Sequence, residues 1–411
     1  MPDITAARAD LLKVFQAGIA RVDGRACVNS SLTDIAGEVS LIAVGKAAQA
    51  MAMGAVDGLG KQIVDGLVIS KPGHLDHGQL KLHGLNGIEG GHPVPDASSL
   101  VAGEALVDFI QSLPKDRQLL FLISGGASGL VEKLREGYGL EQLQQINQWL
   151  LGSGLPITSM NRVRKSISQI KGGGLITVVD GRPAKVLLIS DVPGDDPGVI
   201  GSGLLVPERD PIGTLDDLSL PSWLNDLLPS ALGNDVEQST QNIDVEIVAS
   251  LRLAREAAAE KARELGYTVT VLHAHLGGEV EVVGRRLAYE LVDAWPGLYI
   301  WGGEPTVKLP DNPGRGGRNQ HLALTVAGCI AGNRNVCFLA AGTDGGDGPG
   351  DDAGAVVDGA TISRGARASR LDYEACLTRA DSGTFLEASG DLINTGPTGT
   401  NVMDLMIGIR L

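Results

Sequence analysis

Cysteine is scarce in this sequence: its 411 residues include four cysteines, and no two of them form a Cys-x-x-Cys pair. A disulfide-rich secreted scaffold or a cysteine zinc knuckle needs more thiols at closer spacing. We therefore expect the thiols to be structural, in a protein of the reducing cytoplasm.

Long apolar runs and basic patches are also missing. No segment approaches the roughly 18 consecutive apolar residues of a membrane span, and the first fifteen residues lack the apolar core of a signal peptide. Lys and Arg number 34 against 49 Asp and Glu, a formal charge of −15. This charge repels nucleic acid phosphates and anionic lipid. The expected partner is a small molecule, with no nucleic acid and no membrane, and the sequence leaves a homodimer open.

Short apolar runs alternate with segments of helical period along the chain. SLIAVG precedes KAAQAMAMGAVDGL, and QLLFLISG precedes GLEQLQQINQWLLGSG. Continuous apolar strands of this kind predict a parallel sheet covered by helices on both faces, with ligands outside the carboxyl ends of the strands. The predicted fold class is α/β.

The segment 207–239 interrupts this alternation. It is rich in proline and acidic residues and has little periodicity, which is typical of a connector. We predict two α/β domains, one over 1–239 that includes the connector and one over 240–411.

Two loops of the first domain carry candidate ligands at strand ends. Gly45 and Lys46 follow SLIAV and precede a helix, so Lys46 would add its charge to the positive end of the helix dipole. Ser124, Gly125, Gly126 and Ser128 follow LLFLI in the same way and could cradle phosphate through hydroxyls and backbone. A surface lysine and an ordinary strand-to-helix turn are the alternatives. Neither loop is a Walker A sequence, since Ser40 and Ala47 stand where Gly and Ser or Thr are required.

The densest basic stretch of the first domain is NRVRKSISQIK. Helical spacing would place Arg164 and Lys171 on one face, available to a ligand, unless the helix is simply solvated. The next apolar run ends in SDVPGDD, where Asp191 is the candidate base or metal ligand.

The second domain has two glycine-rich loops. GRGGRNQ places Arg318 and Asn319 just before a predicted helix, where the arginine fork suits a carboxylate or phosphate. GTDGGDGPGDDAGA follows an apolar strand and lacks the EF-hand pattern. Its Asp344 and Asp347 are candidates for holding Mg²⁺ or ordering arginines, and turn formation by aspartate is the alternative.

Nine motifs in order resemble the glycerate 2-kinase family, whose C-terminal module is called MOFRL. They are GKAAQAM, GGHPVPDASS, LISGGASGL, NRVRKSISQIKGG, LISDVPGDD, GGEPTV, GRGGRNQHLAL, GTDGGDGPGDDAGAVVDG and NTGPTGTNVMDL. The resemblance implies a Rossmann-like N-terminal domain, a MOFRL-type C-terminal domain and a site in the cleft between them. It also implies transfer of the ATP γ-phosphoryl group to the 2-hydroxyl of D-glycerate, with Lys46 and Arg318 as the family's active-site pair.

Both lines of reasoning lead to one assignment of roles. Lys46 would neutralise the migrating phosphoryl group, Arg318 and Arg164 would hold the glycerate carboxylate, and Gly45 and Asn319 would assist. The loop from Ser124 to Ser128 would hold the ATP phosphates. Asp191 would act as base or bind Mg²⁺, with Asp344 as a second metal ligand.

Two alternatives belong to other classes. Some relatives are labelled hydroxypyruvate reductase, but no Gly-x-Gly-x-x-Gly opens a helix after a strand here, as an NAD(P)H site would require. A non-catalytic anion-binding protein is the other alternative.

Overall fold

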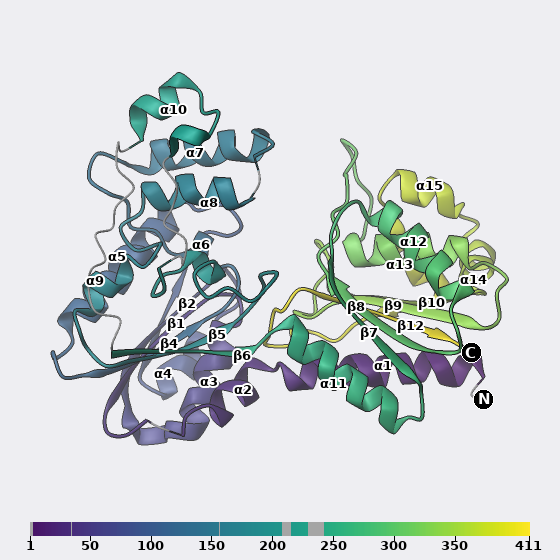
Figure 1. Ribbon diagram of the computed structural model, residues 1–411, viewed down its shortest axis with the longest axis horizontal. Helices are drawn as coiled ribbons and strands as arrows, with labels where there is room; N and C mark the ends of the chain where they lie inside the picture. The colour runs from purple at the N-terminus through teal and green to yellow at the C-terminus, as the bar shows by residue number, and fades with distance from the viewer. Residues whose placement is uncertain (1–2, 34, 156, 208–214, 229–241) are drawn as a thin grey trace. The chain divides into compact units, whose positions relative to one another are not determined.

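A computed structural model describes residues 3–33, 35–155, 157–207, 215–228 and 242–411, which form two compact units (Figure 1). Gly24–Val248 form the Rossmann-like unit, and Met1–Asp23 with Ala249–Leu411 form the C-terminal unit. Each unit contains one six-stranded sheet. The predicted α/β class is confirmed.

The sheet of the Rossmann-like unit has the order β3-β2-β1-β4-β5-β6. Pairs β1–β2, β2–β3, β1–β4 and β4–β5 are parallel. Its strands are β1 (Val39–Val44), β2 (Ile63–Ser70), β3 (Leu85–Glu89), β4 (Gln118–Ile123), β5 (Ala184–Ile189) and β6 (Ile243–Ala249). All residues of β1 and β5 are buried, as expected of apolar strands covered on both faces.

Helices cover both faces of this sheet (Figure 1). One face carries α2 (Gly24–Ser30), α3 (Ala48–Leu59), η1 (Gly60–Gln62) and α4 (His77–Leu82). The other carries α5 (Ala97–Ser112), α6 (Ala127–Leu130), α9 (Leu175–Val179) and η2 (Ile200–Ser202). Because β1 and β4 are parallel neighbours, the helices that follow them, α3 and α6, start at the same edge of the sheet.

A separate helical layer extends this unit. It consists of α7 (Leu140–Gly152), α8 (Ile157–Ser166), η3 (Leu215–Asp217) and α10 (Ser222–Leu227). The layer has its own apolar cluster, in which Ile146 and Val163 are fully buried. This packing holds α7 against α8, and both helices contribute to the candidate site described below.

The C-terminal unit has a mixed sheet of order β11-β10-β9-β12-β8-β7. Its strands are β7 (Val269–Leu276), β8 (Gly297–Gly303), β9 (Val336–Gly342), β10 (Gly354–Asp358), β11 (Leu392–Ile393) and β12 (Asp404–Arg410). Because β12 runs antiparallel to β8 and β9, its first residue, Asp404, pairs with their last residues, Gly303 and Gly342.

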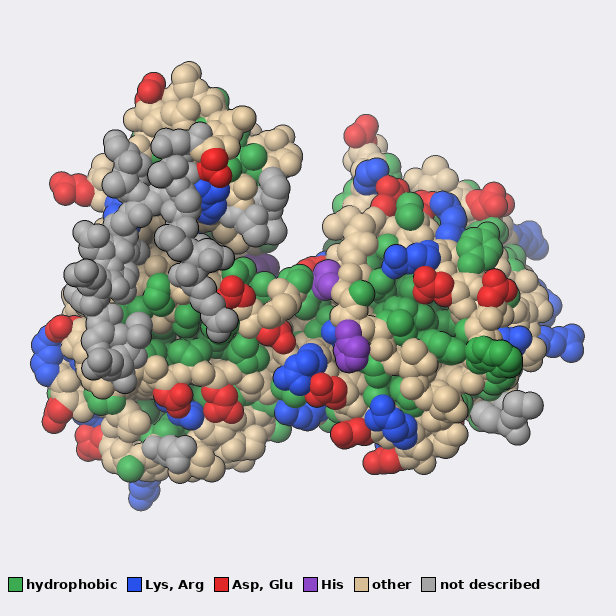
Figure 2. Space-filling view, viewed as in Figure 1, with side chains coloured by type: hydrophobic (Ala, Val, Ile, Leu, Met, Phe, Trp, Pro, Cys, Tyr) green, Lys and Arg blue, Asp and Glu red, His purple; other side chains and the backbone are tan. Residues whose placement is uncertain are grey.

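Helices cover both faces of this second sheet as well (Figure 1). One face carries α1 (Ile4–Arg21) and α11 (Leu251–Glu264). The other carries α12 (Val280–Asp293), α13 (Arg318–Cys329), α14 (Thr361–Ser369), α15 (Tyr373–Thr378) and α16 (Ser382–Ser389). Acidic and basic side chains are interspersed over the face of this unit that Figure 2 shows.

The observed division of the chain differs from the predicted one in two places. β6 extends the first sheet beside β5, so this unit continues to Val248. The N-terminal helix α1 belongs to the C-terminal unit, where Arg8 pairs with Asp358 and Asp391 at 2.7 and 2.6 Å. Much of the predicted connector, 208–214 and 229–239, lies outside the described residues. Among the helices that are described, none is long and apolar enough to cross a membrane.

Candidate active site

The strand order of the Rossmann-like unit reverses between β1 and β4. Ligands of open α/β sheets bind at such a switch point, outside the carboxyl ends of the strands. The Lys46 loop follows β1 and the 124–128 loop follows β4. Two hydrogen bonds join them: Lys46 N donates to Gly125 O at 2.9 Å, and Ala47 N donates to Ser124 Oγ at 3.0 Å.

Gly45 and Ser124 form the closest point between these loops. Gly45 has φ of +136°, and a Cβ there would collide with the Ser124 side chain and lie 2.6 Å from its carbonyl oxygen. The Ser124 side chain is fully buried. Both residues therefore hold the two loops together, and their expected contacts with ligand stay a prediction.

Lys46 presents an open positive charge at the switch point. Its side chain is partly buried, and its ammonium makes no hydrogen bond or ion pair with any residue that the structure describes. The following helix, α3, has no side-chain cap at its N-terminus. An anion here would meet both the ammonium and the positive end of the helix dipole.

His92 lies beside Lys46 and was not predicted as a site residue. Gly126 separates the two, since a Cβ on Gly126 would approach the His92 ring at 3.1 Å and Lys46 Cγ at 3.2 Å. Burial lowers the pKa of His92 to about 4, and the charges of Lys46, Lys71 and His74 act in the same direction. The ring is therefore neutral at pH 7. The motif GGHPVPD contained this histidine, but its spacing gave no reason to single it out.

We expect the ¹³C and ¹H resonances of the His92 ring to stay constant between about pH 5.5 and 8, a range in which an ordinary histidine titrates. Lys46→Met should raise the pKa of His92 because it removes a repelling charge, while burial keeps the pKa below its ordinary value. His92→Gln assigns the resonance. A wild-type pKa near 6.5 would contradict the described environment.

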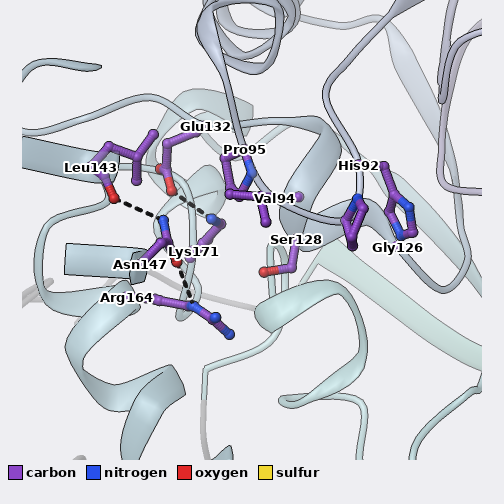
Figure 3. A pocket seen from close by; sticks show the side chains of 12 residues that line it. His92, Val94, Pro95, Gly126, Ser128, Glu132, Leu143, Asn147, Arg164 and Lys171 are labelled. Carbon is purple, nitrogen blue, oxygen red and sulfur yellow. Dashed lines mark hydrogen bonds and ion pairs between the residues drawn. The ribbon is translucent and has the colours of Figure 1, made fainter. Parts of the chain in front are cut away.

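A cavity of about 300 Å³ begins at Gly126 and His92 and extends to the helical layer (Figure 3). Ser128 lines it, with its hydroxyl 2.7 Å from that of Ser202. The predicted phosphate loop therefore faces this cavity with Gly126 and Ser128.

Arg164 lies on the wall opposite His92 in Figure 3 and is held by neutral groups. Its Nε donates to Asn147 Oδ1 at 3.0 Å and its Nη1 to Asn161 Oδ1 at 3.3 Å. Among the described residues no carboxylate pairs with this guanidinium, and burial lowers the pKa of Arg164. By contrast, Arg162 on the same helix pairs with Asp217 at 2.7 Å.

Lys171 also lines the cavity, although α8 ends at Ser166 and the predicted helical face does not extend so far. Its ammonium pairs with Glu132 at 2.5 Å, and both side chains are 1% exposed. Ser168 Oγ donates to the other Glu132 oxygen at 2.6 Å. The pair is thus neutral overall and structural.

Asp191 follows β5 by two residues and is partly buried. It stands at the carboxyl edge of the sheet, as the sequence predicted. Its role as a base or metal ligand stays a prediction.

The C-terminal unit gathers a second group of charged residues at the carboxyl edge of β8 and β9. Arg318, the first residue of α13, donates through Nε to Asp404 Oδ2 at 2.8 Å and through Nη2 to Asp404 Oδ1 at 3.2 Å. Its Nη1 lies 2.8 Å from Glu304, just after β8. Burial acts to lower the pKa of Arg318, but Asp404, Glu304 and Asp347 outweigh it and the pKa is raised.

Asp347 occupies the N-terminus of α13. Its carboxylate accepts hydrogen bonds from the backbone N–H groups of Asn319 and Gln320 at 2.9 and 2.8 Å. The negative charge at this helix start is the protein's own aspartate. Asn319 is 1% exposed and donates its side-chain N–H to Asp347, so its expected contact with substrate stays a prediction.

Asp344 is partly exposed after β9, and its Oδ1 accepts from Gly346 N at 3.1 Å. Asp344 Oδ1 and Asp404 Oδ1 lie 3.2 and 3.5 Å from the position that a Gly342 Cβ would take. Within the described part of the chain, no three His, Cys, Asp or Glu side chains form a metal-binding group. Neither Asp344 nor Asp191 therefore belongs to a group of three such ligands among the described residues.

Comparison with known proteins decides the family. Residues 10–219 match DUF4147, a domain of unknown function, and residues 297–404 match the MOFRL family. A D-glycerate 2-kinase of Thermotoga maritima is 36% identical over 385 residues, which cover 90% of each chain. The chain belongs to the glycerate 2-kinase family.

The similarity to known proteins extends over the whole chain. A crystal structure of a glycerate kinase from Thermotoga maritima matches with a TM-score of 0.84 at 32% identity, covering 99% of this chain and 100% of that one. A relative from Agrobacterium vitis, named a putative hydroxypyruvate reductase, is 36% identical over 420 residues, covering 97% of this chain and 93% of its own. The predicted family is confirmed.

The two residues that the glycerate 2-kinase resemblance singles out have opposite environments. The ammonium of Lys46 is open to an incoming anion, whereas the guanidinium of Arg318 is already bound by two carboxylates. Lys46 is therefore suited to bind phosphate, and Arg318 is suited to position Glu304 and Asp404.

Proposed function

We propose that this protein transfers the γ-phosphoryl group of ATP to the 2-hydroxyl of D-glycerate and produces 2-phosphoglycerate. The observation that carries the proposal is the open ammonium of Lys46 at the switch point, beside a cavity that contains the guanidinium of Arg164, which no described carboxylate neutralises. The name of the Thermotoga relative supports glycerate as the acceptor.

Phosphoryl transfer requires positioning and charge neutralisation more than covalent chemistry from the protein. In this proposal Gly125, Gly126 and Ser128 hold the phosphates of ATP, and Lys46 stabilises the charge on the group in transfer. Arg164 binds the glycerate carboxylate. Asp191 accepts the proton of the attacking hydroxyl.

Residues of the C-terminal unit contribute to the same reaction. Mg²⁺ in phosphoryl-transfer sites uses one or two carboxylates together with substrate phosphates and waters. Asp344 fits this need because it is partly exposed and its carboxylate has a single described contact, from a backbone N–H. Bound Mg²⁺ would neutralise phosphate charge, and Arg318 would keep Glu304 and Asp404 in place, with Asn319 beside them.

The turn after β1 argues against a reductase. It reads GKAAQA, so Ala47 stands where a dinucleotide fingerprint needs its second glycine to let the backbone approach the pyrophosphate. Hydroxypyruvate reduction is nevertheless the outcome that the test must distinguish.

The test is a coupled assay on the full chain. We expect ADP release that requires both D-glycerate and Mg²⁺, no NADH or NADPH consumption with hydroxypyruvate, and a ³¹P NMR spectrum of the product identical to that of 2-phosphoglycerate. Nicotinamide oxidation without ADP release would overturn the proposal. A 3-phosphoglycerate spectrum would refute only the position of transfer.

A further inference from the structure

The guanidinium of Arg164 is held in a way that leaves its charge available. Both of its described partners are amide oxygens, from Asn147 on α7 and Asn161 on α8. Partly buried arginines are ordinarily paired with carboxylates, as Arg162 is with Asp217. The two amides orient the guanidinium as carboxylates would, but without neutralising it.

The orientation of Asn147 is unambiguous. Its Nδ2 donates to the carbonyl of Leu143, one turn earlier in α7, at 2.9 Å. A carbonyl only accepts and a guanidinium only donates, so Oδ1 must face Arg164. Asn147 is 2% exposed, and Figure 3 shows it between Leu143 and Arg164 at the cavity wall.

The remaining charges of the cavity cancel. Of the described residues that line it, the ionisable ones are His92, Glu132, Arg164 and Lys171. Lys171 and Glu132 neutralise each other, and His92 is neutral at pH 7. One positive charge remains, on Arg164. Lys46 lies at the other end of the cavity, beside His92, where the proposed function places the ATP phosphates. At the wall that carries Arg164, one positive charge matches one carboxylate, whereas a dicarboxylic acid would bring a second negative charge without a partner there.

We propose that Asn147 is a positioning residue that determines specificity: by holding Arg164 with an amide, it makes this cavity select small monocarboxylic acids. The inference rests on the proposed function for the reaction, but it concerns the binding of the acid alone. An aspartate at position 147 would keep the shape of the site and cancel the charge.

The test compares three variants of the full chain. Asn147→Asp cancels the charge of Arg164, and Asn147→Ala removes the support but leaves the charge. Asn242→Asp is the matched control: its amide donates to the carbonyl of Gly181 at 2.9 Å, it is exposed, and it lies near the amino ends of β5 and β6. Binding is measured by calorimetry without ATP, using glycerol, D-glycerate and tartronate, which share a three-carbon skeleton and carry zero, one and two negative charges.

We expect the wild type to prefer D-glycerate to both other compounds. Asn147→Asp should weaken D-glycerate binding by about 100-fold, the effect of losing a hydrogen-bonded charge, and Asn147→Ala by about 5-fold. The KM for D-glycerate should rise in the same order, while the KM for ATP should not change in either variant. Asn242→Asp should keep the wild-type values of both constants. A merely structural role would give the reverse order, because alanine loses both hydrogen bonds and leaves a gap.

Equal effects of Asp and Ala, or a fall in affinity for ATP or inorganic phosphate instead of D-glycerate, would overturn the inference. Thermal unfolding of each variant shows whether the comparison is made on folded protein. A wild type that binds D-glycerate or acetate selectively but releases no ADP would overturn the proposed reaction and keep the inference. A wild type that binds no monocarboxylate would overturn both.

Discussion

Replacing Lys46 with methionine should lower kcat by about 1,000-fold, the upper range for removing one preorganised donor from a transition-state charge. Methionine keeps much of the length of the side chain and removes the ammonium. Since that ammonium has no described charged partner to lose, the free energy of unfolding should change by no more than about 0.5 kcal/mol. The measurement is steady-state ADP release at saturating D-glycerate and MgATP.

The control is Lys61→Met, at an exposed lysine of the same unit, which should leave kcat unchanged. Near-normal turnover by the Lys46 variant would remove Lys46 from the mechanism. A large drop in stability would show instead that the ammonium supports the switch-point loops.

Replacing Arg318 with methionine should destabilise the C-terminal unit by about 3 to 5 kcal/mol, because it leaves Asp404 charged and buried without its partner. Asp404 is 1% exposed, and burial already raises its pKa to about 6 against the attraction of Arg318. The double variant Arg318→Met with Asp404→Asn should recover most of the stability, since an amide needs no counter-charge. Chemical denaturation of the wild type, the single variants Arg318→Met and Asp404→Asn, and the double variant measures this coupling.

The pH dependence of the single variant gives an independent check. A carboxyl group with a folded-state pKa above its unfolded value of about 3.9 binds more protons when folded, so its contribution to stability falls as pH rises through that window. Arg318→Met should raise the folded-state pKa of Asp404 further. The stability that the variant loses relative to wild type should therefore be smaller at about pH 5.5 than at pH 8. A stability loss below about 1 kcal/mol would mean that Asp404 is not held as a buried charge. If the double variant recovers stability but not turnover, Arg318 also acts on the substrates.

Local sequence was sufficient for the switch-point loops. An apolar strand, a glycine and a lysine before a helix are adjacent in the chain, so their geometry follows from short-range rules. The sequence also placed Arg318 just before a helix, of which it is the first residue in the structure, and it placed Asp344 just after a strand, where the structure has it. Roles that depend on a partner were less predictable. Asp347 and Arg318 looked like an aspartate for metal and an arginine for substrate. In the structure Asp347 accepts from backbone N–H groups at a helix start, and Arg318 pairs with Asp404.

The sequence by itself determined the α/β class, the family, and the strand-end positions of Lys46, Asp191 and Asp344, because apolar period and short motifs are local properties of the chain. Tertiary structure alone decided which charges are neutralised. Arg162 and Arg164 are two residues apart and chemically identical, yet one faces Asp217 and the other faces Asn147. The burial that makes His92 neutral, and the antiparallel strand that brings Asp404 to Arg318, likewise depend on chain segments far apart in sequence. Charge compensation acts through space, and it is therefore visible only once the chain is folded.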